Sequence, residues 1–427
     1  MASISSLIGK YRPDLEPLKG LYKYYHANPE LSNQESETAA SIASQLRDIS
    51  PDFTIKTNIG GHGLAAILFN GSGPTVLLRA DIDALPVLER TGLEYSSKKV
   101  MINVEGVEKN VMHACGHDMH ITTLLGAARL LISARDSWSG TLILAFQPAE
   151  ERGTGAQAMV DDGMYDPSRH DVPIPDVAIG AHVTSARAGV VGTRRGIIAT
   201  SADSMRVTLH GKGSHASTPH KAVDPVVMAA STVMKLQTIV SREIDPADSA
   251  VVTVASIHAG DAENVIADDA TMAIDTRSIT QATRDRVLAR IKAIVNAESM
   301  AAMASQEPTF VMTRSFPLTI NDVSVTSKIE ETFKAHFGEA QGAYDPDIPR
   351  FGASEDFSIL ATAVGKPYCF FMYGGTDPTR WDEAEAKGLL EQSIPSNHSG
   401  LFAPVIMPTL QAGLDGYAAA ALTFLIK

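Results

Sequence analysis

The eight residues from His113 to His120 (HACGHDMH) bring a thiol, three imidazoles and a carboxylate into one short stretch. In an extended chain, residues i and i+2 project to the same side, so Cys115 and His117 could face one metal ion together. Gly116 between them lets the backbone pass close to that ion. Thiolate and imidazole are the ligands that zinc prefers, and imidazole also binds other divalent metals. A buried cysteine beside surface histidines is the alternative, but the density of ligand-type side chains favours a metal site.

Two adjacent glutamates, Glu150 and Glu151, follow the apolar run 141–146 (TLILAF) after only three residues. Open α/β sheets place their ligand sites at the carboxyl ends of strands. Adjacent carboxylates at the end of a buried strand are costly unless they bind something. One of the two could therefore ligate a metal while its neighbour activates a water molecule. A solvated acidic loop is the alternative for the pair taken alone.

Further candidate side chains follow other expected strands or lie in loops. His182 closes the apolar run 177–183 (VAIGAHV), where a hydrogen-bonded core histidine is the better explanation for it alone. His398 lies in a loop of small residues and carries no signal by itself. Asp81 and Asp83 follow another apolar strand, and one of them could accept a proton from a ligand imidazole and so fix its tautomer. A turn or helix-capping aspartate is the alternative for each.

The elements that must position these residues follow the pattern of an α/β fold. Apolar strands alternate with helical segments up to about residue 200, which predicts a mostly parallel sheet flanked by helices. Between them, residues 201–316 give the order β-α-β-β-α-β, the ferredoxin-like signature of an α+β domain. The α/β pattern then resumes to the end of the chain. We therefore predict a catalytic domain from residues 1–200 and 317–427, with an inserted ferredoxin-like domain from 201–316.

Composition limits the class of protein. The 427 residues are 44% apolar and carry a formal net charge of −13, which supports a globular core and argues against a nucleic-acid partner. No run of about 18 apolar residues and no secretory leader is evident, so we expect neither a membrane span nor export. Two cysteines cannot form a disulfide framework, and the cytoplasm is the simplest compartment.

Taken together, the motifs resemble those of one known family. The stretches LLRADIDALPV, MHACGHDMH, FQPAEE, GAHV, GKGSHASTPH, NVI, FGASEDFS and NHSGLF occur in this order along nearly the whole chain. This order resembles the amidohydrolase branch of the aminoacylase/carboxypeptidase metallopeptidases. That branch includes hippurate hydrolases, N-acyl-amino-acid amidohydrolases and the hydrolases of auxin–amino-acid conjugates.

The resemblance implies a role for each candidate. It implies two divalent metal ions per subunit. These would be zinc or manganese, and cobalt or nickel is also compatible with the family. Glu150 matches the general base and Asp83 the carboxylate behind a ligand. His215 would assist the scissile carbonyl from the inserted domain, and Asn264 would contact the substrate. The implied metal ligands are Cys115 (shared by both ions), His117, Glu151, His182 and His398.

The resemblance also implies the reaction and its partners. We expect hydrolysis of the amide bond of a small N-acyl amino acid or a similar conjugate, by a homodimer that associates through the inserted domain. One departure limits the substrate, because Phe316 stands where some carboxypeptidase relatives present an arginine to the substrate carboxylate, with Arg314 two residues earlier. A dipeptidase or carboxypeptidase on the same site is therefore one alternative, and a non-catalytic metal-binding protein is another.

Overall fold

The computed structural model describes residues 3–338 and 342–427, which form two compact units. The first unit is drawn from the described parts of Met1–Ile198, Ile320–Arg350 and Asp356–Lys427. The second comprises Ala199–Thr319 and Phe351–Glu355. Strands β9 (Gly196–Ala199) and β16 (Thr319–Asn321) lie where the chain passes between the units. The second unit is thus inserted into the sequence of the first.

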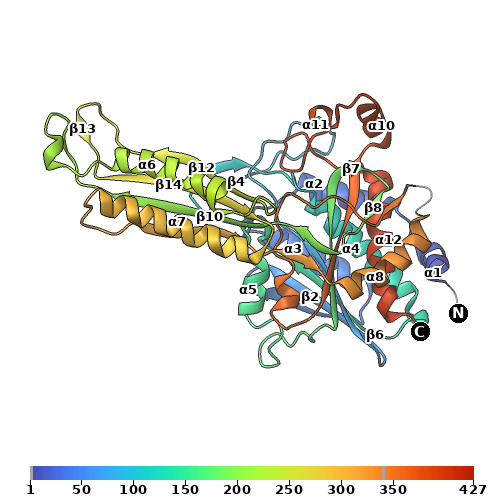
Figure 1. Cartoon of the computed structure of the whole chain (residues 1–427). Helices are drawn as coiled ribbons and strands as arrows, with labels where there is room; N and C mark the ends of the chain where they lie inside the picture. Colours follow the sequence, from blue (N-terminus) through green and yellow to red (C-terminus); the bar gives the residue numbers. More distant parts are fainter. Residues whose placement is uncertain (1–2, 339–341) are drawn as a thin grey trace. The chain divides into compact units, whose positions relative to one another are not determined.

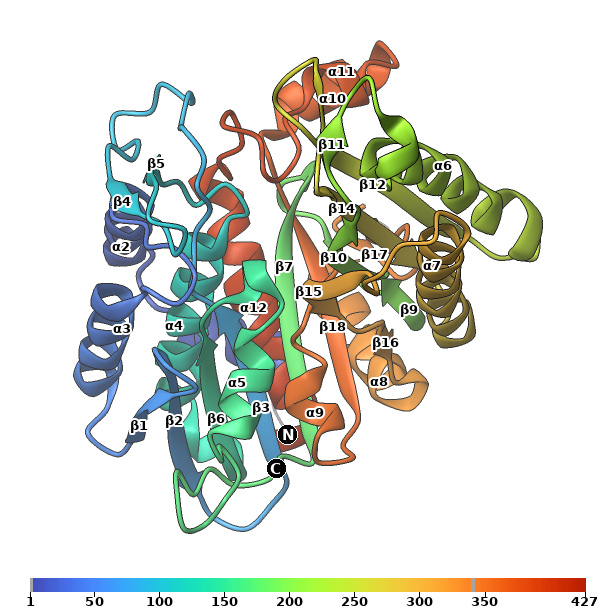
Figure 2. The same cartoon turned by 90° about the vertical axis from the view of Figure 1, so that its left-hand side faces the viewer.

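The first unit is built on one mixed sheet of eight strands, seen in Figures 1 and 2. Its central strands are parallel, because β3 pairs with β6 and β7, and β7 pairs with β18. These strands are apolar and buried along nearly their whole length, as expected of strands that helices cover on both faces. In spatial order the strands are β1 (Thr54–Ile59), β2 (Gly63–Asn70), β6 (Gly140–Gln147), β3 (Thr75–Asp81), β7 (Val177–Arg187), β18 (Tyr368–Thr376), β8 (Val191–Gly192) and β17 (Tyr344–Asp345).

Helices cover both faces of this sheet. Helices α4 (His117–Ser133) and α12 (Ile406–Leu425) pack together on one face, while α5 (Gly155–Asp161) and α9 (Ile359–Thr362) lie on the other (Figure 2). The largest apolar core lies between the sheet and the first pair. The prediction of a mostly parallel sheet flanked by helices is confirmed. The other elements of the unit are α1 (Ile4–Tyr11), α2 (Glu16–Ala27), α3 (Ser36–Ile49), α8 (Val323–Phe333), α10 (Pro378–Ala386), α11 (Leu390–Ser393), the hairpin β4 (Val100–Ile102) and β5 (Glu108–Asn110), 3-10 turns at Arg135–Ser137 and Glu150–Arg152, and a π-helical turn at Lys334–Gly338.

The second unit has the ferredoxin-like order that the sequence predicts. Its antiparallel sheet runs β12 (Ala250–His258), β14 (Asp269–Ser278), β10 (Ser201–His210) and β15 (Thr309–Phe316). Helices α6 (Pro225–Thr238) and α7 (Gln281–Ala301) share an apolar core with the sheet. Helix α6 starts directly after Asp224, whose carboxylate accepts the backbone N–H of Val226 at 2.9 Å and so caps the helix. The unit also contains a small two-stranded ribbon of β11 (Ser214–His215) and β13 (Val265–Ile266). Its remaining elements are a 3-10 turn at Pro219–Lys221 and a π-helical turn at Ile239–Glu243.

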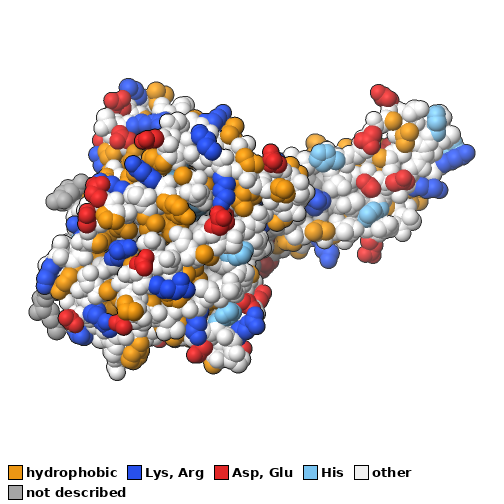
Figure 3. Space-filling view, turned by 180° about the vertical axis from the view of Figure 1, so that it is seen from behind, with side chains coloured by type: hydrophobic (Ala, Val, Ile, Leu, Met, Phe, Trp, Pro, Cys, Tyr) orange, Lys and Arg blue, Asp and Glu red, His pale blue; other side chains and the backbone are white. Residues whose placement is uncertain are grey.

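The surface and the helices add two observations. Figure 3 shows acidic and basic side chains interspersed on one face of the larger unit, so neither sign of charge dominates that face. Among the helices of the described residues, none combines the length and the apolar composition that crossing a bilayer requires.

Candidate functional site

Cys115 and His117 flank a left-handed turn at the start of helix α4. Gly116, the residue before the helix, has φ +86°, a conformation that glycine adopts at no steric cost. A Cβ atom there would lie 2.4 Å from the Cγ1 atom of Val183 on β7. The turn therefore needs glycine both for its backbone and for this close approach. It fixes the directions of the thiol and the imidazole on either side.

Glu150 and Glu151 form a buried turn just after strand β6. The turn starts from Ala149, which has φ +48°, and its N–H donates to the Glu35 carboxylate at 2.8 Å. The N–H of Glu151 donates to Oδ2 of Asp83 at 3.1 Å. Backbone hydrogen bonds to two buried carboxylates thus hold the turn.

The structure brings together the side chains that the sequence singles out in the first unit. The Sγ atom of Cys115 lies 3.4 Å from Nε2 of His182 and 3.3 Å from Nε2 of His398. The same nitrogen of His398 lies 3.4 Å from Oε2 of Glu151. Nε2 of His117 lies 3.8 Å from Oε1 of Glu151. Donor atoms from segments up to 283 residues apart in sequence therefore share one cluster, and several sets of three are close enough to hold an ion.

Hydrogen bonds behind the cluster orient its histidines. Nδ1 of His117 donates to the backbone oxygen of Asp83 at 2.9 Å and lies 3.3 Å from its Oδ1. Nδ1 of His182 donates to the backbone oxygen of Val183 at 2.6 Å. Both rings thus carry a proton on Nδ1 and direct Nε2 toward the cluster, the orientation that metal-ligating histidines adopt. Asp83 is itself held by the Ser32 hydroxyl, which donates to its Oδ2 at 2.6 Å.

Two donor atoms of the cluster are buried and have no hydrogen-bond partner among the described residues: Nε2 of His117 and Oε1 of Glu151. Glu150 adds a further buried carboxylate, with Oε2 3.9 Å from Nε2 of His117. Unpartnered buried lone pairs and adjacent carboxylates are expensive unless a cation compensates them. The thiol, imidazole and carboxylate donors are also the ligand types that zinc and related divalent ions accept. The residues therefore fit a divalent metal centre.

The pKa shifts have the same physical origin. Burial, with Glu151 and Glu150 nearby, raises the pKa of the Cys115 thiol well above its usual value. Burial lowers the pKa of His182, so this ring stays neutral. Burial also opposes the protonation of His117, but the surrounding carboxylates, chiefly that of Asp81, outweigh it and raise its pKa to about 10. The cluster thus has an excess of negative charge that draws in protons or cations.

Sequence reasoning missed the pairing of Asp81 with His120. Oδ1 of Asp81 lies 2.5 Å from Nδ1 of His120, while Nε2 of that ring accepts the N–H of Val183 at 2.8 Å. The buried guanidinium of Arg79 donates to Asp81 at 2.8 Å and to Gln147 at 2.8 Å. Asp81 is therefore part of a buried network beneath the cluster and not an isolated turn residue. The spacing of His120 could have indicated this pairing. It follows His117 by three residues, which places both imidazoles on the same face of a helix.

A second missed network lies behind the loop that carries the ligands. Nδ1 of His26 contacts Oδ2 of Asp118 at 2.7 Å, and its Nε2 contacts Oε1 of Glu89 at 3.0 Å. Burial lowers the pKa of His26, but the two carboxylates outweigh this effect and raise it to about 9. A buried imidazolium thus joins α2 to the residue that follows His117. No spacing rule links these three positions, which are far apart in the sequence.

His215 and Asn264 belong to the second unit, where His215 ends strand β11 of the small ribbon and Asn264 immediately precedes strand β13. The N–H of Ala216 donates to the backbone oxygen of Asn264 at 2.9 Å. The exposed His215 ring accepts the N–H of Ser217 on Nδ1, at 3.1 Å. In a neutral imidazole the proton then resides on Nε2, which leaves this ring with a free hydrogen-bond donor.

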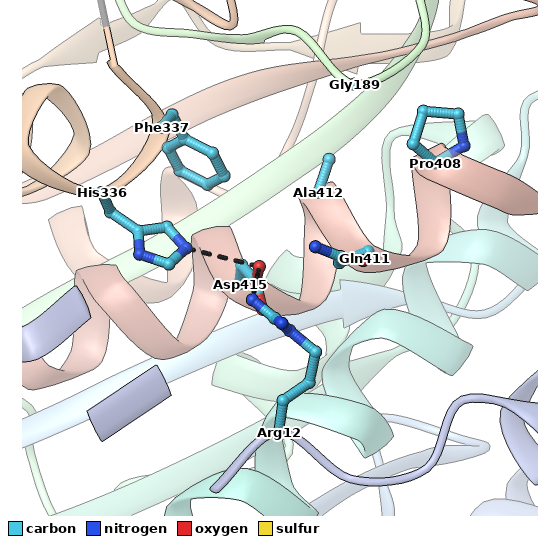
Figure 4. A pocket seen from close by; sticks show the side chains of 8 residues that line it. All are labelled: Arg12, Gly189, His336, Phe337, Pro408, Gln411, Ala412 and Asp415. Atoms are coloured by element: carbon cyan, nitrogen blue, oxygen red, sulfur yellow. Dashed lines mark hydrogen bonds and ion pairs between the residues drawn. The ribbon is translucent and has the colours of Figure 1, made fainter. Parts of the chain in front are cut away.

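A separate cavity of about 270 Å³ in the first unit contains none of the predicted site residues (Figure 4). Its charged groups neutralise one another, because Arg12 donates two hydrogen bonds to Asp415, at 2.9 and 2.6 Å. The imidazole of His336 lies 3.3 Å from the same carboxylate. The triad ties the end of α1 and the π-helical turn to α12, which explains a buried carboxylate in an otherwise apolar helix.

Comparison with known proteins identifies the family. The model of Peptidase family M20/M25/M40 matches residues 77–387. The chain belongs to this family. It is accordingly a hydrolytic enzyme that acts on amide bonds and depends on divalent metal ions, as the sequence predicts. The alternative of a non-catalytic metal-binding protein is set aside.

Curated relatives cover most of the chain. N-acetyl-L-cysteine deacetylase from Bacillus subtilis is 36% identical over 365 residues, which are 84% of this chain and 80% of the relative. Hippurate hydrolase from Campylobacter jejuni is 34% identical over 368 residues, 84% of this chain and 89% of the relative. Thermostable carboxypeptidase 2 from Saccharolobus solfataricus is 32% identical over 425 residues, 98% of this chain and 99% of the relative.

Solved structures agree on the fold. A putative aminohydrolase from methicillin-resistant Staphylococcus aureus superposes with a TM-score of 0.81 at 29% identity, covering 99% of this chain and 100% of the other. A dinuclear metal-binding peptidase of the M20 family from Bacillus subtilis gives a TM-score of 0.71 at 24% identity, covering 96% of this chain and 98% of the other. The second likeness bears on the fold alone.

Proposed function

We propose that this M20-family enzyme hydrolyses the amide bond of N-acyl amino acids. The observation that carries the proposal is the convergence of a thiol, imidazoles and adjacent glutamates in one buried cluster of the first unit. Relatives named as a deacetylase of N-acetyl-L-cysteine and as a hippurate hydrolase support the substrate class. Both names describe an acyl group joined to an amino acid.

We assign the metal-binding role to five side chains. Cys115 lies within 3.4 Å of both His182 and His398, which supports its role as the ligand shared by two ions. Divalent ions held there would polarise the amide carbonyl and lower the pKa of water. Zinc or manganese is our proposal for the metal, with cobalt or nickel as alternatives. The full set is Cys115, His117, Glu151, His182 and His398.

Glu150 is the proposed general base. Its carboxylate is buried, and Oε2 lies 3.9 Å from Nε2 of His117, so it lies at the edge of the ligand cluster. A carboxylate in this position can take a proton from the attacking water and later pass it to the nitrogen of the leaving amine. Asp83 would keep His117 in the tautomer that offers Nε2, through the contacts already described.

His215 and Asn264 are the proposed substrate contacts from the second unit. Because Nδ1 of His215 already accepts a hydrogen bond from Ser217, its Nε2–H is free to donate to the oxygen of the amide carbonyl. Such a donor matters most in the transition state, where charge develops on that oxygen. Asn264 is positioned beside His215 by the ribbon and would contact the same substrate.

A substrate panel on reconstituted protein tests the proposal. Metal-stripped protein is loaded with zinc, manganese, cobalt or nickel in turn and assayed with N-acetyl, N-benzoyl and indole-acetyl amino acids beside dipeptides. We expect kcat/KM to be highest on N-acyl amino acids, and no turnover before metal is added. Faster hydrolysis of dipeptides would favour the second candidate, a dipeptidase or carboxypeptidase, which the nearly full-length likeness to a carboxypeptidase supports.

We also propose a homodimer formed through the second unit. Strand β12 is an edge strand whose described sheet neighbour is β14 alone, so its outer backbone groups are available for pairing. The adjacent helix α6 leaves Val227 65% and Met234 71% exposed. Exposed apolar side chains beside an open strand edge are typical of an association surface.

The oligomeric state can be tested by light scattering after gel filtration. Met234→Glu should shift the protein from dimer to monomer, because a charge would be buried in the interface. Met300→Glu is the matched control, since Met300 is equally exposed but lies at the end of α7. A wild-type monomer, or dissociation by the control variant as well, would argue against this interface.

The cytoplasm remains our proposed compartment. Both cysteines are unpaired and buried, and Cys115 must remain reduced to serve as a ligand. Fractionation of the native host tests this, and recovery of the protein outside the reducing compartment would contradict it.

A further inference from the structure

Two loops of the first unit lie against each other beside His398. The backbone N–H of Arg90 donates to the carbonyl oxygen of Gly400 at 2.7 Å. A Cβ atom at Gly400 would lie 2.5 Å from the carbonyl oxygen of Leu88 and 3.5 Å from Nε of Arg90, so glycine is what permits the approach. The Arg90 side chain therefore runs alongside the turn that carries His398. That histidine is in turn 3.3 Å from the Sγ atom of Cys115.

The charge of Arg90 is available to a ligand. Its side chain is exposed. Among residues 3–338 and 342–427, no acid or hydrogen-bond acceptor contacts its guanidinium. The neighbouring carboxylate of Glu89 is engaged elsewhere, because it accepts hydrogen bonds from Ser97 N–H at 2.6 Å and from Thr91 and contacts His26 at 3.0 Å. A guanidinium without an internal partner thus stands at the border of the candidate metal centre.

Its surroundings favour an anionic ligand with an apolar part. Leu88 is 58% exposed and Leu401 is 50% exposed, and both lie on the two loops that meet at Gly400. A guanidinium offers paired N–H donors that match the two oxygens of a carboxylate. Apolar side chains beside it can cover the carbon skeleton next to that carboxylate. The combination matches an amino acid with an apolar side chain and a free carboxyl group.

We infer that Arg90 binds the substrate carboxylate, with Leu88 and Leu401 contacting the adjacent apolar side chain; this inference rests on the proposed function. Arg90 would then bind the substrate carboxylate in a chain that has Phe316 at the position where some relatives have an arginine. Arg277 is not an equivalent candidate, because it already contacts Asp275 at 3.1 Å and Ser354 at 2.9 Å.

The test compares substrates that differ only in the carboxyl group. N-acetyl-L-leucine and N-benzoyl-L-leucine are each assayed beside the corresponding carboxamide, with metal-loaded wild type, Arg90→Gln, Arg90→Lys and Arg47→Gln. Arg47 is an exposed residue of α3 and provides the same change in charge away from the centre. Metal content and thermal unfolding of each variant confirm that the fold and the ions are retained.

We expect the ratio of kcat/KM for the acid to that for its carboxamide to fall about 10- to 100-fold in Arg90→Gln, as for loss of a charged hydrogen bond. The loss should appear mainly in KM, Arg90→Lys should recover part of it, and Arg47→Gln should leave the ratio unchanged. An unchanged ratio in Arg90→Gln, with wild type hydrolysing the acids, would overturn the inference alone. If wild type hydrolyses neither acid nor carboxamide, the proposed function fails together with it.

Discussion

Nε2 of His117 lies 3.8 Å from Oε1 of Glu151, and neither atom has a hydrogen-bond partner among the described residues although both are buried. Two such atoms in a water-poor site need a positive charge between them: without a metal ion this is the proton that the raised pKa of His117 retains on the ring, and a bound divalent ion would replace that proton. Asp83 holds the imidazole from behind, so the ring cannot turn its N–H toward the glutamate without losing that contact. The pair therefore acts as a preformed half of a cation site.

Removal of metal should destabilise the protein for this reason. An ion that binds only the folded state, and is present at a free concentration 100 times its Kd, adds about 2.7 kcal/mol to the free energy of unfolding. We therefore expect chelated protein to unfold at a lower temperature, and re-addition of a divalent ion to restore the original Tm. Differential scanning calorimetry measures the shift. Identical transitions in the stripped and loaded protein would contradict a site that stabilises the fold.

Glu150→Gln should abolish most turnover while preserving the centre. The amide keeps the size of the side chain but cannot accept the proton of the attacking water, and positioned general bases contribute about 10²- to 10⁴-fold to rate. We expect kcat to decrease by a factor of about 10² to 10⁴, while the metal content stays normal. Glu331→Gln, an exposed glutamate on α8, provides the matched control. Near-normal kcat in a fully loaded Glu150→Gln protein would refute the role of Glu150.

Gly116→Ala should disturb the turn that carries the ligands. The added Cβ would lie 2.4 Å from Cγ1 of Val183, and the backbone would have to keep φ +86°. The second effect alone costs about 1–2 kcal/mol for a residue with a side chain. We expect lower metal content and a lower Tm.

The double variant Gly116→Ala/Val183→Ala separates the two causes. Removing the valine methyl groups relieves the clash but not the backbone strain, so metal content should recover in part. A double variant no better loaded than the single one would show that the contact with Val183 does not set the turn.

The His26 network predicts a pH dependence of stability. The pKa of His26 rises from 6.5 in the unfolded chain to about 9 in the folded protein, because Asp118 and Glu89 outweigh burial. Protonation therefore favours the folded state, and the contribution is complete below pH 6.5 and is lost as the pH rises through 9. This shift corresponds to about 3 kcal/mol.

His26→Gln isolates this contribution. Denaturant titrations give the unfolding free energy of wild type and variant at each pH. The difference between the two should shrink by about 3 kcal/mol from pH 6 to pH 9.5. His170, a half-buried histidine paired with Asp162, provides the control through His170→Gln. A wild-type-minus-variant difference for His26 that does not vary with pH would contradict a charged imidazole at this position.

The sequence predicted the elements and the cluster for identifiable reasons. Apolar runs such as Thr141–Phe146 predict buried strands, and the polar residues after them meet at one edge of a parallel sheet. The order of strands and helices also predicted the inserted ferredoxin-like unit. The proximity of Cys115, His182 and His398 agrees with the expectation of one cluster, while their roles as ligands remain predictions.

The supporting contacts could not be predicted in the same way. His26, Glu89 and Asp118 come from three segments, and only the packed fold brings them together. The partner of Gly116 is a methyl group of Val183, which no local pattern identifies. Such contacts depend on how whole helices, strands and loops pack against each other. The positions of residues at strand ends follow from the sheet topology alone.

Metal content per chain tests the central claim most directly. Elemental analysis of purified, zinc- or manganese-loaded protein should give two ions per chain for wild type and a clear loss for Cys115→Ala, because the proposed shared ligand is removed. Cys369→Ala is the matched control, since that cysteine is equally buried but lies on β18 among apolar residues. It should retain both ions. Two ions in the Cys115→Ala protein, or none in wild type, would contradict a paired-metal centre at this cluster.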